Sequence, residues 1–196
     1  MIQDPIQSQF SGIPWEKALC FTGHRPEKLP QGKALDGLLR TLHYYICQSI
    51  DIGYTHFLTG LADGVDYYAS DILFWLRRQY PQIRVIGVQP CDRQYEAFFS
   101  RCGYSLEHLR IMRENVDRLI VLPGVPWERG VFHRRNRLMV EHSSAIIAVC
   151  RDGRSGSMQT YHYARQFNLN FCRIYPDPPP GRIPEPTEWY VERSGL

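Results

Sequence analysis

The chain has 196 residues, of which 43% are hydrophobic and 22% charged, and its formal net charge is +3. These values are typical of a globular protein and exclude a disordered chain, a collagen-like fibre and a small disulfide-stabilised protein. No apolar run reaches the roughly 18 residues that span a bilayer, and residues 1–10 lack the basic and apolar regions of a signal peptide. We therefore expect a cytoplasmic protein without a membrane partner.

Short apolar runs alternate with longer segments of helical periodicity along the chain. In chain order, the predicted strands are 18–22, 55–59, 83–88, 118–122, 145–150 and 171–175. Helical spacing predicts helices at 34–50, 64–79, 131–142 and 157–167, with one or two short helices within 95–112. Nearly continuous apolar strands separated by helices are typical of a parallel sheet covered on both faces. The expected fold is a single doubly wound, Rossmann-like α/β domain with a mainly parallel sheet.

Proline density sets the expected C-terminal boundary of this domain. Prolines occur at 176, 178, 179, 180, 184 and 186, and they exclude a helix or an interior strand. The sequence therefore predicts an N-terminal arm at 1–14, a domain at 15–175 and a Pro-rich C-terminal tail at 176–196. Whether this tail docks on a partner, folds back or stays loose is left open.

Glycine-containing polar loops follow the predicted strands, where ligands bind in open α/β sheets. In the first loop, Gly23 lets the backbone approach a ligand, and Arg25 can bind a phosphate or a carboxylate. His24 can donate a hydrogen bond or act as a base near neutral pH. The alternative is an ordinary tight turn with solvated side chains.

The second loop places Gly60 and Gly64 directly before a predicted helix. A helix N-terminus presents free N–H groups and partial positive charge to an anion. Asp66, in the first turn, can accept a hydrogen bond from a ribose hydroxyl or simply offset the helix dipole. The spacing matches neither the dinucleotide-binding fingerprint nor the P-loop, so it is weak on its own.

The third loop combines small residues and hydroxyls between the fifth strand and the next helix. Its members are Gly153, Ser155, Gly156 and Ser157. They suit a phosphate cradle made of backbone N–H groups. Ser155 or Ser157 can equally be the N-cap of the helix, and the two roles are compatible because they use the same backbone donors.

The densest basic stretch lies in and just before the helix predicted at 131–142. It comprises Arg129, His133, Arg134, Arg135 and Arg137, with Asn136 between them. These residues can line a ligand site, contact nucleic acid or form a solvated helix surface. Seven histidines and six cysteines are scattered without metal-ligand spacing, so no metal site is expected. The serine-hydrolase and H-E-x-x-H motifs are absent from the sequence.

Four motifs occur in a characteristic order. They are F-T-G-H-R-P after the first strand, G-L-A-D-G-V-D after the second, R-N-x-x-M-V in the basic helix, and D-G-x-S-G-S after the fifth strand. Together they resemble the SLOG superfamily, the Rossmann-like group that includes DprA/Smf and the LOG phosphoribohydrolases, and especially its YpsA-like branch. The resemblance implies a nucleotide or nucleotide-derived ligand, and no other cofactor. By motif, the implied ligand-binding residues are Gly23, His24, Arg25, Gly60, Gly64, Asp66, Arg135, Asn136, Gly153, Ser155, Gly156 and Ser157.

One departure from the family pattern bears on catalysis. LOG enzymes carry P-G-G-x-G-T-x-x-E, whose glutamate serves cleavage of the N-glycosidic bond. With Ser157 at the threonine position, Thr160 takes the glutamate position, and threonine cannot act as a carboxylate. The favoured hypothesis is therefore a nucleotide-binding sensor or regulatory module without turnover.

Two other functions stay open at this stage. One is a nucleoside-phosphate hydrolase-like enzyme that uses His24 or Asp66 as a relocated acid or base. The other is a single-stranded nucleic-acid binder of DprA type that uses Arg134, Arg135 and Arg137. Exposed aromatic residues in a small α/β domain would also allow a homodimer.

Overall fold

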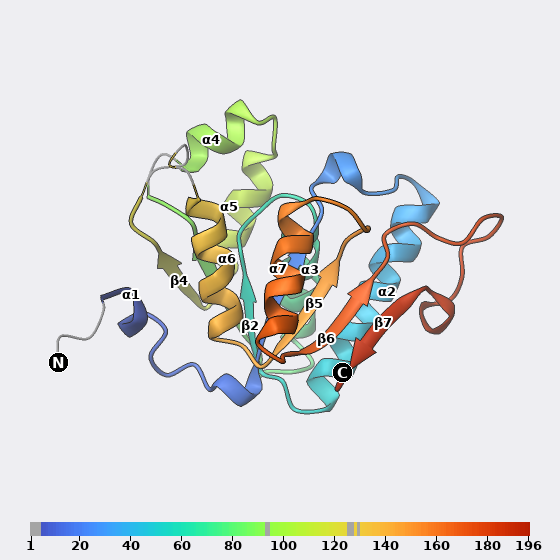
Figure 1. Cartoon of the computed structure of the whole chain (residues 1–196), viewed down its shortest axis with the longest axis horizontal. Helices are drawn as coiled ribbons and strands as arrows, with labels where there is room; N and C mark the ends of the chain where they lie inside the picture. The colour runs from blue at the N-terminus through green and yellow to red at the C-terminus, as the bar shows by residue number, and fades with distance from the viewer. Residues whose placement is uncertain (1–4, 93–94, 125–127, 129) are drawn as a thin grey trace.

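A seven-stranded sheet forms the centre of this computed structural model, which describes residues 5–92, 95–124, 128 and 130–196 (Figure 1). The strand order is β4-β3-β2-β1-β5-β6-β7. The strands are β1 (Ala18–Gly23), β2 (His56–Thr59), β3 (Arg84–Gln89), β4 (Arg118–Val121), β5 (Ala145–Val149), β6 (Asn170–Ile174) and β7 (Val191–Ser194). The first six are parallel and β7 is antiparallel to β6, which confirms the mainly parallel, Rossmann-like α/β fold.

Helices cover both faces of this sheet. Helices α2 (Lys33–Asp51) and α3 (Val65–Leu76) pack on one face, and α6 (Val131–Glu141) and α7 (Gly156–Gln166) pack on the other. The shorter elements are α1 (Pro5–Ser8), α4 (Tyr95–Arg101), α5 (Leu106–Asn115), η1 (Trp15–Lys17), η2 (Pro26–Lys28) and η3 (Pro186–Glu188). None of the helices in the described part of the chain is long and apolar enough to cross a membrane.

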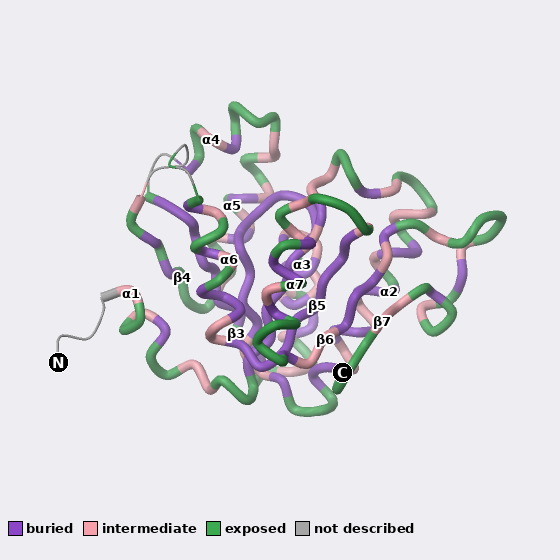
Figure 2. Tube along the Cα trace, viewed as in Figure 1, coloured by how far each residue is buried: buried purple, intermediate pink, exposed green. Residues whose placement is uncertain are grey.

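The central strands are apolar throughout because both of their faces are buried. Leu19 and Phe21 of β1 join the core under α2 and α3, whereas Cys20 joins the core under α6 and α7. Every residue of β5 is buried. Figure 2 shows the buried residues concentrated in the strands, with the exposed residues on the outer turns and loops. This alternation of side chains between two covered faces explains the continuous apolar runs in the sequence.

The chain reverses its direction of travel across the sheet between β4 and β5. From β1 it proceeds outward through β2 and β3 to β4, and it then returns to place β5 on the other side of β1. The loops that follow β1 and β5 therefore run in opposite directions. A crevice forms between them at the carboxyl ends of these two strands, where ligands bind in folds of this kind.

The C-terminal segment at 176–196, predicted as a Pro-rich tail, folds back onto the domain, which is one of the alternatives that the sequence leaves open. Strand β7 pairs with β6, with Ile174 opposite Val191. Trp189 is 4% exposed, lies in the core beneath α2, and its Nε1 donates to the carbonyl oxygen of Tyr175 at 2.6 Å. The prolines do keep residues 176–185 free of helix and strand. They do not prevent an edge strand after the last of them.

The N-terminal arm is also packed against the domain over the residues that the structure describes. Phe10 is buried, and its ring stacks on the ring of His142 with centroids 4.0 Å apart. The arm therefore covers the end of α6.

Candidate ligand-binding site at the switch point

A pocket of about 230 Å³ lies at the carboxyl ends of β1 and β5, in the crevice that the strand order creates. Of the predicted ligand-binding residues it is lined by Gly23, His24, Arg25, Asp66, Arg135, Asn136, Ser155, Gly156 and Ser157. Gly60, Gly64 and Gly153 do not line it. The lining also includes residues outside the implied ligand-binding set, namely Phe21, Thr22, Glu27, Lys28, Ala62, Phe132 and His133.

His24 holds the elements around the pocket together. Its backbone N–H donates to the carbonyl oxygen of Val149 at 3.1 Å, and its carbonyl oxygen accepts from the N–H of Val65 at 3.2 Å. Its ring Nε2 accepts from the backbone N–H of Arg151 at 2.9 Å, so the ring proton is on Nδ1. Burial, with the charges of Arg151 and Lys28, lowers the pKa of His24. In this arrangement the ring is a neutral acceptor, and its Nε2 is engaged by the backbone.

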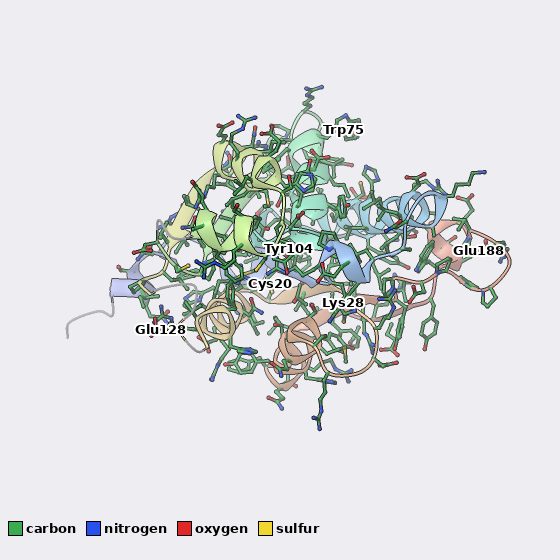
Figure 3. All side chains as sticks on the ribbon, turned by 90° about the horizontal axis from the view of Figure 1, so that it is seen from above. Cys20, Lys28, Trp75, Tyr104, Glu128 and Glu188 are labelled. Atoms are coloured by element: carbon green, nitrogen blue, oxygen red, sulfur yellow. The ribbon has the colours of Figure 1, made fainter. Side chains whose placement is uncertain are left out.

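Two cationic side chains border the pocket on the β1 side. Arg25 is half-buried, and its guanidinium lies 5.0 Å from the centre of the Tyr104 ring. Its Nη1 donates to the carbonyl oxygen of Asp63 at 3.3 Å, which uses one of its five N–H donors. Lys28 is exposed at the rim. Seen from above, Lys28 and Tyr104 lie toward the middle of the molecule, whereas Trp75 and Glu188 lie at its periphery (Figure 3).

Asp66 forms a wholly buried part of the pocket wall. Its Oδ2 accepts from the backbone N–H of Ala62 at 3.4 Å. Burial raises the pKa of this carboxyl, although the charges of Arg135 and Arg25 oppose the shift. The pocket therefore holds a carboxyl group whose charged form is disfavoured.

Arg135 is a structural residue rather than an exposed cation. It is 4% exposed, and its guanidinium donates to the carbonyl oxygens of Gly60 and Val88. Its Nε donates to Oδ1 of Asn136 at 2.6 Å. The suggestion that Arg135 contacts nucleic acid from an exposed helix face is therefore wrong, because tertiary packing buries it. Arg129 of the same basic stretch lies outside the described residues.

Gly60 and Gly64 do not line the pocket but pack against residues that do. A Cβ atom on Gly60 would collide with the Arg135 guanidinium and lie 2.6 Å from Oδ2 of Asp66. Gly64 has a φ of +90°, and a Cβ there would collide with the carbonyl oxygen of His24. Both positions need glycine for close approach of neighbouring groups, which is a packing role. Gly153 lies in an exposed part of its loop.

The N-terminus of α7 faces the pocket from the β5 side. Ser155 is its N-cap, and its side chain accepts from the N–H of Met158 at 3.1 Å. Oγ of Ser157 donates to the carbonyl oxygen of Gly23 at 2.7 Å. The N–H groups of Gly156 and Ser157 belong to the first turn, where no carbonyl lies one turn earlier in the helix to accept from them. The N-cap prediction is confirmed, and the phosphate cradle stays a prediction.

Thr160 lies one turn further along α7 and pairs with the uncharged side chain of Asn136. Its Oγ1 donates to the carbonyl oxygen of Gly156 at 2.8 Å and accepts from Nδ2 of Asn136 at 2.8 Å. No carboxylate occupies this position. Among the described residues, no group of three or more His, Cys, Asp and Glu side chains could hold a metal ion.

The fold resembles two solved structures of DNA processing protein A (DprA). The protein from Streptococcus pneumoniae is 18% identical, with a TM-score of 0.51, over 80% of this chain and 49% of that one. The protein from Helicobacter pylori, described for its single-stranded DNA binding mode, is 18% identical, with a TM-score of 0.54, over 95% and 79% of the two chains. This chain thus spans about half the length of the S. pneumoniae protein. At such identity the likeness shows the fold alone.

Sequence comparison adds a curated relative and a family. The uncharacterized SPbeta prophage-derived protein YoqJ of Bacillus subtilis (strain 168) is 27% identical over 133 residues, which cover 62% of this chain and 77% of YoqJ. The family model YpsA matches residues 19–170, which include all four motifs around the pocket. Because this match extends over most of the chain, the protein belongs to the YspA SLOG family.

Proposed function

We propose that the pocket binds a nucleotide or nucleotide-derived ligand through its phosphate, as a sensor or regulatory module without turnover. The observation that carries the proposal is the meeting of two cations, Arg25 and Lys28, with the N-terminus of α7 in one pocket at the switch point. Backbone N–H groups and arginine are the donors that recognise phosphate in folds of this class. Phe21 and Phe132 add apolar surface to the same lining.

The state of the acid–base groups supports binding rather than hydrolysis. Cleavage of an N-glycosidic bond in LOG enzymes uses a carboxylate where this chain has Thr160, which is held by Asn136. The Nε2 atom of His24 already accepts from the backbone N–H of Arg151, so it is engaged within the protein. On this basis, prolonged incubation leaves a bound nucleotide intact. Release of free base and sugar phosphate, detected by mass spectrometry, would instead indicate an enzyme.

The test compares two substitutions at Gly156, where an added Cβ meets open space. Gly156→Asp places a carboxylate in the first turn of α7, which favours the helix but repels a phosphate. We expect it to weaken nucleotide binding by about tenfold or more in calorimetric titrations across a nucleotide panel. Gly156→Ala is the matched control and should bind as the unaltered protein does. Equal affinities of the two variants would place the ligand elsewhere.

Single-stranded nucleic acid is a second candidate ligand. The likeness of fold to the H. pylori DprA protein and the exposed positions of Arg134 and Arg137 on α6 favour it. Contact with phosphates predicts an affinity that falls steeply with salt, since bound counterions are released. Anisotropy titrations of a labelled oligonucleotide at increasing salt test this, with the Arg134→Ala/Arg137→Ala double variant as comparison. Lack of binding at low salt would remove this candidate.

A further inference from the structure

A second cavity, here called the α6–α7 groove, adjoins the switch-point pocket. Its volume is about 270 Å³, and it is lined by His133, Asn136, Arg137, Gln159, Thr160 and Tyr163. His133 and Asn136 line both cavities. The two spaces therefore meet at these side chains and continue from the edge of the sheet onto the α6 and α7 layer.

The size of the switch-point pocket suggests that it holds only part of the ligand. Sites for small molecules enclose about 300–1,000 Å³, and this pocket has about 230 Å³. The α6–α7 groove adds a comparable volume directly beside it. Gln159 and Thr160 follow Ser155 and Gly156 by about one helical turn. A phosphate held by the first turn of α7 would thus lie between the two cavities.

The chemistry of the α6–α7 groove suits an anionic, hydrogen-bonding group. Among the described residues that line it, none is a carboxylate, and four carry side-chain N–H groups that can donate, namely His133, Asn136, Arg137 and Gln159. Asn136 and Thr160 bind each other, and Asn136 also lines the pocket. His133, Arg137 and Gln159 are exposed to an incoming ligand.

Arg137 is held in a defined position within this groove. Its guanidinium lies 4.8 Å from the centre of the Tyr163 ring, and the Tyr163 hydroxyl donates to Oε1 of Glu141 at 2.7 Å. An arginine fixed against an aromatic ring loses less side-chain freedom when it binds a phosphate.

We infer that the α6–α7 groove is a second subsite and that the ligand consists of two nucleotide units joined through phosphate. One unit would occupy the switch-point pocket, the linking phosphate the first turn of α7, and the second unit the groove beside Arg137. This inference rests on the proposed function, since it takes the phosphate position from it. A phosphodiester and a pyrophosphate linkage share this chemistry.

The experiment compares the affinities of 5′-AMP, the phosphodiester-linked pApA, the pyrophosphate-linked AppA and a longer oligo(A). The unaltered protein should bind pApA or AppA about tenfold or more tightly than 5′-AMP, and the longer strand no more tightly than the better of the two. The compound that binds more tightly, pApA or AppA, identifies whether the linking phosphate is a phosphodiester or a pyrophosphate. Arg137→Gln should remove this gain while leaving the affinity for 5′-AMP unchanged. Arg165→Gln is the control, because it removes the same charge from an exposed arginine outside the groove.

The other possible results distinguish failure of the second subsite from failure of the proposed nucleotide binding. Binding of 5′-AMP that Gly156→Asp weakens, without any gain for pApA or AppA, overturns the second subsite and leaves the proposed function standing. An equal loss for 5′-AMP and the two-unit ligands in Arg137→Gln also overturns it. If the affinity keeps rising with strand length, the two-unit ligand is ruled out, and the groove binds extended single-stranded nucleic acid instead. Absence of binding to every probe overturns the proposed function and this inference together.

Discussion

Backbone groups, rather than a ligand, already engage two of the polar side chains that the motifs place at the pocket. The His24 ring accepts from the N–H of Arg151, and the Arg135 guanidinium donates to the carbonyl oxygens of Gly60 and Val88. These bonds join loops that lie far apart in the sequence. Both residues therefore shape the pocket, while Arg25, Lys28 and the first turn of α7 offer donors to a ligand.

The neutral His24 ring makes the stability of the protein sensitive to pH. Because the folded-state pKa lies below the ordinary value of 6.5, the unfolded state binds more protons as the solution is acidified. The contribution of the neutral His24 ring to the free energy of unfolding is complete above the pKa of the unfolded state, and it is lost as the pH falls through the pKa of the folded state. The free energy of unfolding should decline as the pH falls below the ordinary histidine pKa of about 6.5, and decline less in His24→Gln. Urea titrations at several pH values measure this, and identical slopes for the two proteins would contradict it.

Gly60 provides a second prediction at the residue scale. Gly60→Ala forces a methyl group against the Arg135 guanidinium, and overpacking of this kind costs about 1–3 kcal/mol in the free energy of unfolding. Gly156→Ala, where the methyl group meets open space, should change it little. Denaturant unfolding of both variants decides the point. Equal stabilities would mean that the loop after β2 relaxes without cost.

At the scale of elements, the last strand shows how a proline-rich segment can still complete a sheet. Residues 176–185 carry five of the six prolines of the C-terminal segment and have no helix or strand, yet β7 follows them and pairs with β6. Asp177, within the segment, binds the Arg151 side chain at 2.6 Å. Since the N–H of Arg151 in turn binds His24, the C-terminal segment is connected to the pocket.

Trp189 anchors this segment, and its removal tests how much the folded-back segment contributes to the stability of the domain. Trp189→Ala should lower the free energy of unfolding by about 3–5 kcal/mol, because a buried tryptophan leaves a cavity. Trp75→Ala is the matched control, since Trp75 is 59% exposed on α3. Unfolding curves in urea compare them. A loss that is as small for Trp189 as for Trp75 would return residues 176–196 to the status of a loose tail.

At the scale of the whole molecule, the strand order assembles the site from four distant parts of the sequence. His24 follows β1, Asp66 begins α3, Asn136 lies on α6 and Gly156 begins α7, yet all line one pocket. A ligand held by several elements at once stabilises the native state as a whole, because it binds the folded chain and not the unfolded one.

The whole-molecule prediction is a ligand-dependent melting temperature. A nucleotide at a hundred times its dissociation constant should stabilise the fold by about 2.7 kcal/mol. Thermal melts with a nucleotide panel should therefore show a clear upward shift in the unaltered protein and in Gly156→Ala. The shift should shrink in Gly156→Asp at the same ligand concentration. A shift that is the same in all three proteins would indicate a binding site away from α7.

Local patterns in the sequence were sufficient for strands β1 to β6, for the helices that cover the sheet and for the edge of the sheet where the pocket lies. The predicted helix at 34–50 corresponds to α2, Lys33–Asp51, because apolar periodicity reports directly on which face is buried. The glycine-rich loops were found for a similar reason, since close backbone approach leaves a local signature. Lys28 escaped notice, although it lies two residues after the F-T-G-H-R-P motif, because nothing local marks a side chain that turns toward a distant loop.

The sequence by itself therefore determined the α/β alternation, the parallel sheet and the loops that border the pocket. Only the tertiary structure decided that Arg135 is buried, that His24 is a neutral acceptor and that β7 completes the sheet. The physical reason is the range of the interactions. Periodicity and turn chemistry act within a few residues, whereas burial and the partners of a hydrogen bond depend on which distant segments the folded chain brings together.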